Sequence, residues 1–253
     1  MKYIILYLLT LAILFPMNGL ELAKAVESRN KPMDVKSTNT MILTNKDGKT
    51  KTRELISLSK DDSEKQIIWF LKPAKDKGIA FLKIEHKDKD DFMTMWLPGF
   101  NRFRRIASSK KSDSFMGSDL SFEDLTNRDI KDYSYNILNN KECNYNDKNY
   151  NCYELESIPI DIDSEYSRHI TWIIEIEEEV FITIKEHSFN KENNLLKIKS
   201  IQFNRLDSYY IMNRLDVKNV QKNHSTLLTV NNITINNDVA DSKFVERTLK
   251  ILP

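Results

Sequence analysis

The sequence predicts a mainly β fold with few helices (an α+β protein), built on an antiparallel sheet. After Pro32, apolar and polar residues alternate with period two through most of the chain, a pattern typical of strands. The connections between these segments are short, and the crossover helices that a parallel sheet would need are not indicated. With only 5 Gly, 6 Pro and no Ser-rich tract, the sequence has no obvious linker. We therefore expect a single domain over residues 20–253.

The elements follow one another from the N-terminus. Residues 20–29 have apolar side chains at helical spacing and predict a short amphipathic helix. Residues 45–48, Asn-Lys-Asp-Gly, are a hairpin turn signal. Residues 92–97 are apolar on both faces and need cover on both sides. In residues 119–125, N-cap residues are followed by acidic residues, a pattern that predicts the start of a helix. Residues 242–249 predict one last helical turn. The predicted strands are residues 35–44, 50–58, 65–71, 79–86, 92–97, 102–108, a cysteine-containing hairpin, 168–176, 180–187, 195–205, 209–220 and 225–235.

One predicted strand illustrates how the sheet should be covered. Its alternation places Ile170, Trp172, Ile174 and Ile176 on one face, and mainly polar side chains such as His169 on the other. An antiparallel sheet commonly packs one face on the core and leaves the other in water. We therefore expect one apolar face and one largely solvated face.

Residues 1–19 have the pattern of a secretory signal peptide. A positive start precedes an apolar run at residues 3–15, which is short for a bilayer span, and residues 16–19 break the run. We prefer cleavage after Gly19, with Ala23-Lys24-Ala25 as the alternative site; an uncleaved N-terminal anchor is the other interpretation. The pattern predicts export to the periplasm. The formal net charge of +1 gives no general attraction to nucleic acid.

Cys143 and Cys152 flank a polar turn segment. If Asp147-Lys148 forms the tip of a hairpin, the two cysteines fall directly opposite each other. They would be a non-hydrogen-bonded pair with Cα atoms about 4.5 Å apart, within the usual disulfide range of about 4.4–6.8 Å. In an oxidising compartment we expect a disulfide. Two unpaired buried thiols are the alternative, and no Cys-x-x-Cys or neighbouring His cluster favours a metal site.

Five motifs between Phe70 and Leu125 carry a resemblance to a known family. They are Phe70-Leu71-Lys72-Pro73-Ala74, Lys77-Gly78-Ile79-Ala80-Phe81-Leu82, Leu97-Pro98, Phe103-Arg104-Arg105-Ile106 and Phe115-Met116-Gly117-Ser118-Asp119-Leu120-Ser121-Phe122-Glu123-Asp124-Leu125. In order and spacing they resemble the LolA-like outer-membrane lipoprotein-sorting proteins, and the likeness extends more weakly over nearly all of the mature chain. Thr94 stands where the family often has an aromatic residue.

The resemblance implies an incomplete β-barrel, in which a helical lid covers the apolar concave face of a curved antiparallel sheet. It also implies a periplasmic carrier of lipid or lipoprotein acyl chains, which receives cargo from an inner-membrane transporter and passes it to an outer-membrane acceptor. Similar branches are associated with lipid exporters, so the cargo is either lipoprotein or free lipid. The alternative function is a non-catalytic module that docks on a transporter's periplasmic domain.

Large apolar residues of the predicted strands and of the last motif are the candidates for lipid binding. The thioethers of the methionines suit irregular ligands, and ordinary core packing is the alternative role. These candidates are Trp69, Leu82, Ile84, Met93, Met95, Trp96, Met116, Phe122, Trp172, Ile174 and Ile182.

Arg104 and Arg105 are candidates for contact with a lipid headgroup or a partner protein. As neighbours on a strand they point to opposite sides, so one of them would face the mouth of the barrel. A salt bridge with Asp119 or Asp124 is the alternative. Ser118 and Asp119 are interpreted as a cap of the helix that follows, rather than as headgroup ligands.

The sequence gives little support to catalysis. A Gly-x-Ser-x-Gly elbow is absent, because Gly117 is followed directly by Ser118. The four histidines, His86, His169, His187 and His224, show no metal-ligand spacing, and there is no Gly-rich phosphate loop. We therefore expect a protein that is not an enzyme and needs neither a metal nor a cofactor.

Overall fold

The computed structural model describes residues 17–160 and 164–253. Most of the expected signal peptide, residues 1–16, lies outside the described residues. The strands are β1 Asp34–Thr44, β2 Thr50–Lys60, β3 Lys65–Lys72, β4 Ala80–Ile84, β5 Phe92–Leu97, β6 Arg102–Ile106, β7 Tyr133–Tyr145, β8 Lys148–Pro159, β9 Tyr166–Glu177, β10 Val180–Asn190, β11 Leu195–Leu206, β12 Tyr209–Asn219 and β13 His224–Ile235. The helices are α1 Gly19–Glu27 and α2 Glu246–Leu249, with short 3-10 turns η1 Pro98–Phe100, η2 Ser108–Lys110, η3 Glu123–Leu125, η4 Ile130–Asp132 and η5 Asp241–Lys243.

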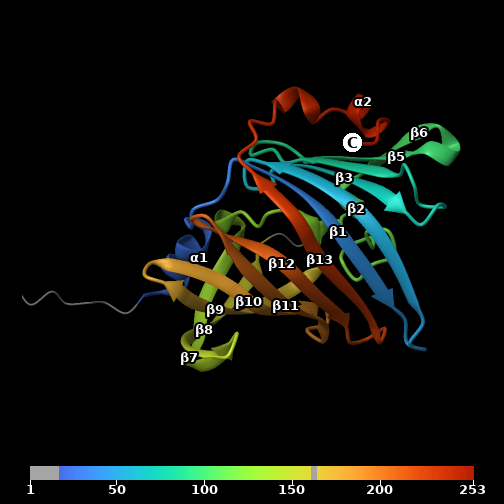
Figure 1. Ribbon diagram of the computed structural model, residues 1–253. Helices are drawn as coiled ribbons and strands as arrows, with labels where there is room; N and C mark the ends of the chain where they lie inside the picture. Colours follow the sequence, from blue (N-terminus) through green and yellow to red (C-terminus); the bar gives the residue numbers. More distant parts are fainter. Residues whose placement is uncertain (1–16, 161–163) are drawn as a thin grey trace, which may run out of the picture.

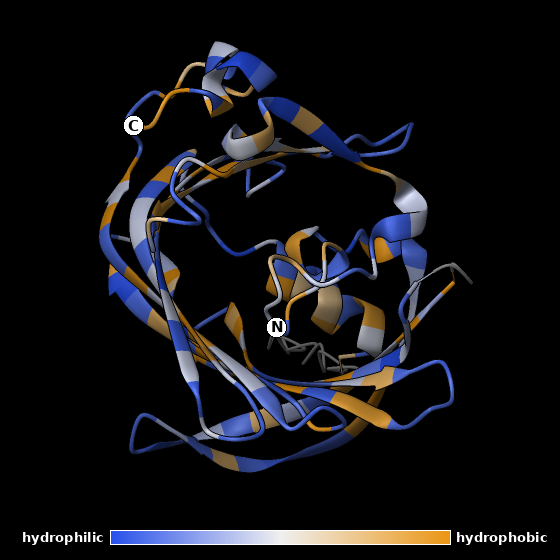
Figure 2. Cartoon of the chain, turned by 90° about the vertical axis from the view of Figure 1, so that its right-hand side faces the viewer, coloured by the Kyte–Doolittle hydropathy of each residue, from blue (hydrophilic) through white to orange (hydrophobic). Residues whose placement is uncertain are grey.

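Within the described residues, all thirteen strands form one antiparallel sheet in the order β6-β5-β4-β3-β2-β1-β13-β12-β11-β10-β9-β8-β7. The sheet curves strongly, and its end strands β6 and β7 do not pair with each other (Figure 1). Figure 2 shows α1 and loop segments inside the curve, with the C-terminal segment outside it. The predicted incomplete barrel is therefore confirmed, and every predicted strand is present with ends shifted by at most a few residues.

Helix α1 is built to pack tightly against the inside of the sheet. Asn18 and Glu21 form a reciprocal capping box, which satisfies backbone N–H groups at the helix start. Gly19 approaches β7 so closely that a Cβ there would lie 2.9 Å from the backbone of Tyr135 and Asn136. Leu22 is fully buried in this contact. The expected cleavage after Gly19 would remove the Asn18 cap.

Strand β5 is covered on both faces, as its sequence predicts. Met93 and Met95 pack on the concave side, together with Phe122 of the connection between β6 and β7. Trp96 packs on the opposite side in a cluster with Phe244 of the C-terminal segment. Burying each such side chain contributes roughly 1.5–3 kcal/mol, so both covers stabilise the open edge of the barrel.

The connection between β6 and β7, residues 107–132, is called the interior loop here, and it departs from the prediction. The predicted helix from Asp119 is absent, and only the three-residue turn η3 forms in this region. Ser118 is not a cap, because its hydroxyl donates to the carbonyl oxygen of Phe115 at 2.7 Å. Asp119 instead accepts a hydrogen bond from Thr226 at 2.7 Å. Both side chains anchor the loop, so its backbone does not continue as a helix.

The cysteine hairpin is also corrected. Its two-residue turn is Asn146-Asp147, both in the left-handed region at φ 49° and 61°, one residue earlier than predicted. Cys143 therefore pairs with Tyr150 rather than with Cys152. Both cysteines are free thiols, although they are diagonal neighbours on adjacent strands whose side chains share a hydrogen bond.

The prediction of one apolar and one solvated face is wrong for β9. Ile174 lies in a buried cluster with Cys152 and Ile182. His169, on the opposite face of the strand, is also buried, with no exposed surface. That face is the concave one, where the interior loop supplies charged partners and keeps water out. Buried polar side chains are tolerated there because they are hydrogen-bonded.

Candidate lipid-binding cavity

A cavity of about 380 Å³ lies between the central strands of the sheet and the interior loop. Ligand pockets usually fall in the range of about 300–1,000 Å³, so the space suits part of a lipid. Phe115, Leu120 and Leu125 of the interior loop form one wall. The apolar side chains that line the sheet wall include Met41, Leu55, Ile68, Leu215, Leu228 and Val230.

The apolar lining is not equally covered around the cavity. Met41 and Leu55 are nearly fully buried in the core beside it. Leu215, Leu228 and Val230 of β12 and β13 keep part of their surface exposed. The cavity therefore presents uncovered apolar surface in the middle of the concave face, where an apolar ligand would remove it from water.

The other end of the cavity is polar and carries charges of both signs, including the carboxylates of Asp34 and Asp62. Arg29 and Lys31, which follow α1, line this end together with Lys60. Lys31 forms an ion pair with Asp62. The Nε atom of Arg29 is buried without a hydrogen-bond partner among the described residues, and its guanidinium lies 5.1 Å from the ring centroid of Phe203. Burial lowers the pKa of Arg29, and the charge of Asp62 partly offsets this.

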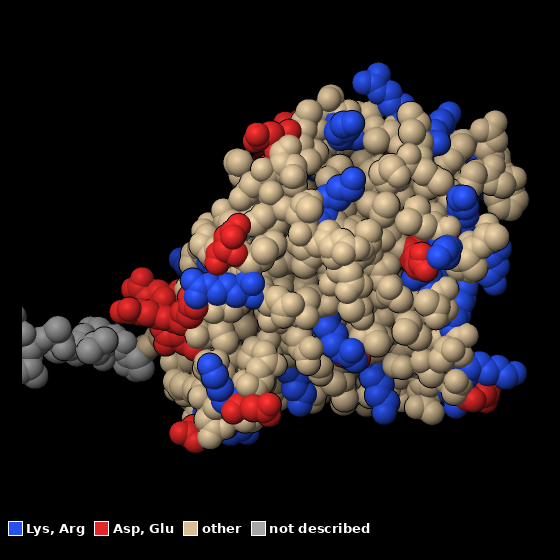
Figure 3. All heavy atoms as spheres, viewed as in Figure 1, with Lys and Arg blue, Asp and Glu red and all other residues tan. Residues whose placement is uncertain are grey.

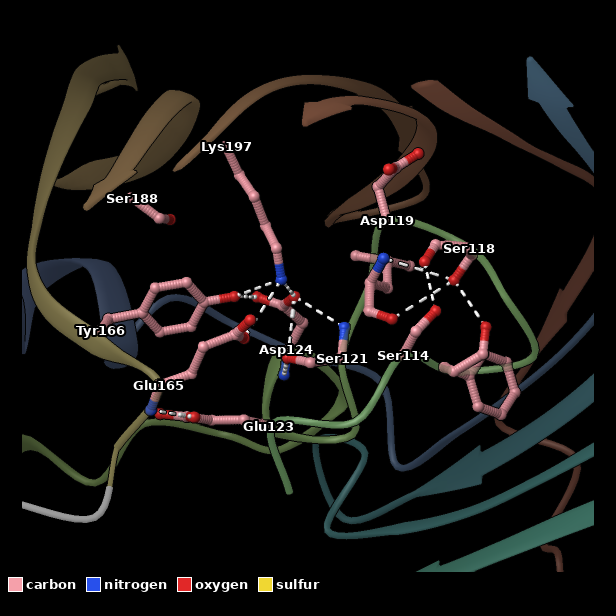
Figure 4. Close-up of polar contacts among 12 residues, drawn as sticks. Ser114, Ser118, Asp119, Ser121, Glu123, Asp124, Glu165, Tyr166, Ser188 and Lys197 are labelled. Atoms are coloured by element: carbon pink, nitrogen blue, oxygen red, sulfur yellow. Dashed lines mark hydrogen bonds and ion pairs between the residues drawn. The ribbon is translucent and has the colours of Figure 1, made fainter. Parts of the chain in front are cut away.

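A buried charge network centred on Asp124 joins the interior loop to the far half of the sheet (Figure 4). The carboxylate of Asp124 accepts hydrogen bonds from Lys197 Nζ at 2.8 Å and Lys199 Nζ at 2.6 Å. It also accepts from the Tyr166 hydroxyl at 2.8 Å and the Ser121 backbone at 2.9 Å. Burial opposes the ionisation of Asp124, but the two lysines outweigh it and hold its pKa well below the ordinary value.

A second part of the network surrounds Glu186 of β10. Arg128 of the interior loop donates to its two carboxylate oxygens at 2.5 and 2.9 Å, a bidentate pair. Lys199 donates to the same carboxylate at 2.9 Å and so links both parts. His169 Nδ1 lies 3.0 Å from the Ser188 hydroxyl. Burial, together with the charge of Arg128, lowers the pKa of His169 well below its ordinary value.

A smaller polar cavity of about 240 Å³ adjoins the apolar one along this network. Leu120, Asp124, Met212 and Leu215 line both spaces. The interior is therefore amphipathic. An apolar cavity lies next to a smaller cavity whose charged side chains form ion pairs with one another. Among the described residues, no group of three or more His, Cys, Asp or Glu side chains is placed to hold a metal ion.

Comparison with known proteins identifies the family. A family model described as "Uncharacterized protein" matches residues 62–251, about three quarters of the chain. The structure of an outer membrane lipoprotein-sorting protein domain from Vibrio parahaemolyticus is similar, with TM-score 0.83 and 28% identity, and it covers 92% of this chain and 98% of that one. The chain belongs to the LolA-like lipoprotein-sorting family. No curated protein sequence matches it.

Two further structures share this LolA-like fold. A DUF1329 family protein from Desulfovibrio piger has TM-score 0.82 and 26% identity, covering 91% of this chain and 97% of that one. A LolA superfamily protein from Nitrosomonas europaea has TM-score 0.68 and 19% identity, covering 90% and 96%. The described part of this LolA-like chain includes no helix with the length and apolar character needed to cross a bilayer.

None of the eleven side chains that the sequence suggested for lipid binding lines the apolar cavity of this LolA-like protein. Four of them pack on the convex side in the cluster that contains Phe244 and Leu249, and Ile174 and Ile182 lie in the cluster near Cys152. The four on the convex side are Trp69, Leu82, Ile84 and Trp96. The alternation of each strand defined two faces but not which one is concave, so it did not indicate which side chains line this cavity.

The other candidates lie nearer to the cavity or at the surface. Met93, Met95 and Phe122 are on the concave side, in the core layer beside the cavity wall. Met116 packs against the same layer and lines a different cavity, described below. Trp172 donates to Glu154 at 3.1 Å and lies beneath the Lys185 ammonium.

Arg104 and Arg105 are both exposed. The guanidinium of Arg105 lies 3.9 Å from the ring centroid of Phe92 and donates to the backbone oxygen of Asp91. The suggested salt bridges to Asp119 or Asp124 are wrong, since those carboxylates bind Thr226, His224 and the two lysines instead.

Sequence reasoning missed the charge network altogether. One signal was present: Lys197 and Lys199 alternate on one strand and therefore project from the same face. A pair of lysines on a face that is otherwise covered needs acidic partners. Those partners are Asp124 and Glu186, and their separation in sequence hides the pairing.

Proposed function

We propose that this LolA-like protein is an exported, periplasmic carrier that binds the acyl chains of lipid or lipoprotein in the apolar cavity. The observation that carries the proposal is the partly exposed apolar surface of Leu215, Leu228 and Val230, enclosed under the interior loop. An acyl chain would cover this surface. Catalysis has no part in the proposal, because binding and release are sufficient for carriage.

The gain from such burial is large. Each buried methylene contributes about 0.8 kcal/mol, so ten methylenes would supply about 8 kcal/mol, near the free energy of micromolar binding. Release therefore needs a competing site or movement of the interior loop. We propose that cargo passes from an inner-membrane transporter to an outer-membrane acceptor that offers such a site.

The two ends of the cavity suggest how cargo lies in it. The acyl chain would occupy the apolar end, and the polar part of the cargo would lie toward Arg29 and Lys31 at the other end. The unpartnered Nε of Arg29 is a ready donor to a headgroup or backbone oxygen. This orientation leaves lipoprotein and free lipid as the two cargo classes.

Adjacent leucines of β13 provide the test. Leu228 lines the cavity, whereas Leu227 next to it points to the other face of the sheet. Native mass spectrometry of protein purified from periplasm should detect bound lipid in the wild type. Leu228→Glu should abolish lipid binding and uptake of acylated peptide, and Leu227→Glu should retain both.

Thermal unfolding of the two variants serves as the folding control. Wild-type protein that is consistently free of lipid and takes up neither lipid nor acylated peptide would contradict the proposal. A stable complex with a transporter domain that survives delipidation would favour the interaction module instead.

A further inference from the structure

A separate cavity of about 330 Å³ opens on the concave side near the β1–β2 hairpin. It shares no lining residue with the apolar cavity. The two spaces lie on either side of the start of the last sequence motif, since Phe115 lines one, and Met116 and Gly117 line the other. Its polar lining includes Lys49, Lys51, Arg53 and His224.

Positive charge is in excess in this second cavity. Asp76 is the acidic partner of both Arg53, at 2.8 Å, and Lys51, at 3.1 Å. One carboxylate thus balances two cations, and Lys49 is exposed beside them. Figure 3 shows Lys and Arg side chains, with acidic ones beside them, at the lower right of the molecule, where Figure 1 places the β1–β2 hairpin.

Arg53 is the unusual member of the group. Its side chain is only 4% exposed, and its Nη1 atom has no hydrogen-bond partner in the described part of the chain. Its Nε donates a hydrogen bond to the carboxylate of Asp76, and its guanidinium lies 5.7 Å from the ring centroid of Phe70. A buried N–H without an acceptor costs free energy, so an incoming acceptor at this position would be favoured.

His224 is held in place at the opposite wall. Its Nδ1 lies 2.7 Å from the carboxylate of Asp119, which Thr226 also contacts at 2.7 Å. Because a carboxylate only accepts hydrogen bonds, Nδ1 carries the proton in this contact. The other ring nitrogen, Nε2, is left available for a further partner.

We propose that this second cavity binds a phosphate group, with Arg53 and Lys51 as the principal ligands and His224 and Lys49 at its edge. Guanidinium and ammonium groups are the side chains that proteins use for phosphate, and the three Lys and Arg side chains outnumber the two carboxylates, Asp76 and Asp119, that contact the lining residues. The site goes beyond the acyl cavity and does not depend on it. The phosphate could belong to a soluble phosphate ester or to an anionic phospholipid headgroup.

Titration calorimetry on the full mature chain tests the site. Inorganic phosphate should bind saturably with one site per chain, and Lys49→Gln/Lys51→Gln should weaken it by at least about tenfold, the effect of losing one charged hydrogen bond. Lys72→Gln, which removes an exposed lysine outside the cavity, should leave binding unchanged. Arg53→Lys, which retains the charge but not the planar fork, should weaken phosphate binding while the protein stays folded.

Vesicles distinguish the two sources of the phosphate. Sedimentation with phosphatidylglycerol vesicles that is lost in Lys49→Gln/Lys51→Gln assigns the site to a headgroup; phosphate binding without sedimentation assigns it to a soluble ester. The absence of saturable phosphate binding, or equal binding by the double variant and the wild type, would overturn the proposal. Leu228→Glu should not alter phosphate binding, which keeps this outcome separate from that of the acyl cavity.

Discussion

Replacement of Asp124 by Asn would remove the central charge of the buried network while preserving the shape of the side chain. The Asp124 side chain is 1% exposed and contacts Lys197 and Lys199, which are 4% and 9% exposed. In Asp124→Asn both lysines lose their shared carboxylate. Each retains one acidic partner, because Lys197 lies 3.2 Å from Glu165 and Lys199 lies 2.9 Å from Glu186. Lys197 also keeps its hydrogen bond to the Tyr166 hydroxyl at 2.7 Å.

The expected loss of stability follows from this geometry. Breaking a buried ion pair by removing one partner typically costs about 3–5 kcal/mol. The remaining acidic neighbours place this substitution near the lower limit, at about 3 kcal/mol. For a chain of this size, each kcal/mol lowers the melting temperature by about 2–4 °C, so a decrease of about 6–12 °C is expected.

Urea unfolding followed by circular dichroism measures the free energy of unfolding, and hydrogen exchange reports on the interior loop. Residues 107–132 should exchange faster in Asp124→Asn, because the network is what joins this loop to β9, β10 and β11. Glu54→Gln is the matched control, since it breaks an exposed pair with Lys72 and should cost about 0–1 kcal/mol.

The result that would refute this reasoning is a change in Asp124→Asn no larger than in Glu54→Gln. A double-mutant cycle with Lys199→Met sharpens the comparison. If the two charges stabilise each other, the double variant should lose less stability than the sum of the single variants. Additive losses would mean that the two side chains act independently.

Three further predictions concern pH, packing and thiol chemistry. His169 stays neutral in the fold but titrates near pH 6.5 when unfolded, so stability should fall by about 1 kcal/mol between pH 6.5 and pH 5.5. In urea unfolding at both pH values, His169→Gln should lose less, and equal losses would contradict the assignment. In protein that retains residues 17–19, Gly19→Ala should lower the melting temperature through its clash with β7, and an unchanged temperature would argue against that contact. Burial raises the pKa of Cys152 to about 12, so mass spectrometry after alkylation should find Cys143 modified first. A disulfide between Cys143 and Cys152 would contradict the prediction that both are free thiols.

The turn of the cysteine hairpin shows how closely a local pattern can approach the fold. Polar residues predicted a hairpin between Cys143 and Cys152, and β7 and β8 form it. The left-handed conformations of Asn146 and Asp147 place the tip one residue earlier than predicted, so every cross-strand partner differs from the prediction. Register depends on the turn geometry, which composition alone does not specify.

The sequence by itself determined the strands, their antiparallel connections and the need for β5 to be covered twice, because these follow from local alternation and short turns. Only the tertiary structure decided which face is concave, since the curvature of the sheet emerges from all of its strands together. It also decided where the cavity lies and that Asp124 would meet Lys197, a partner 73 residues away. Local periodicity carries no information about such distant partners, whereas the folded interior leaves a buried charge few alternatives to an oppositely charged neighbour.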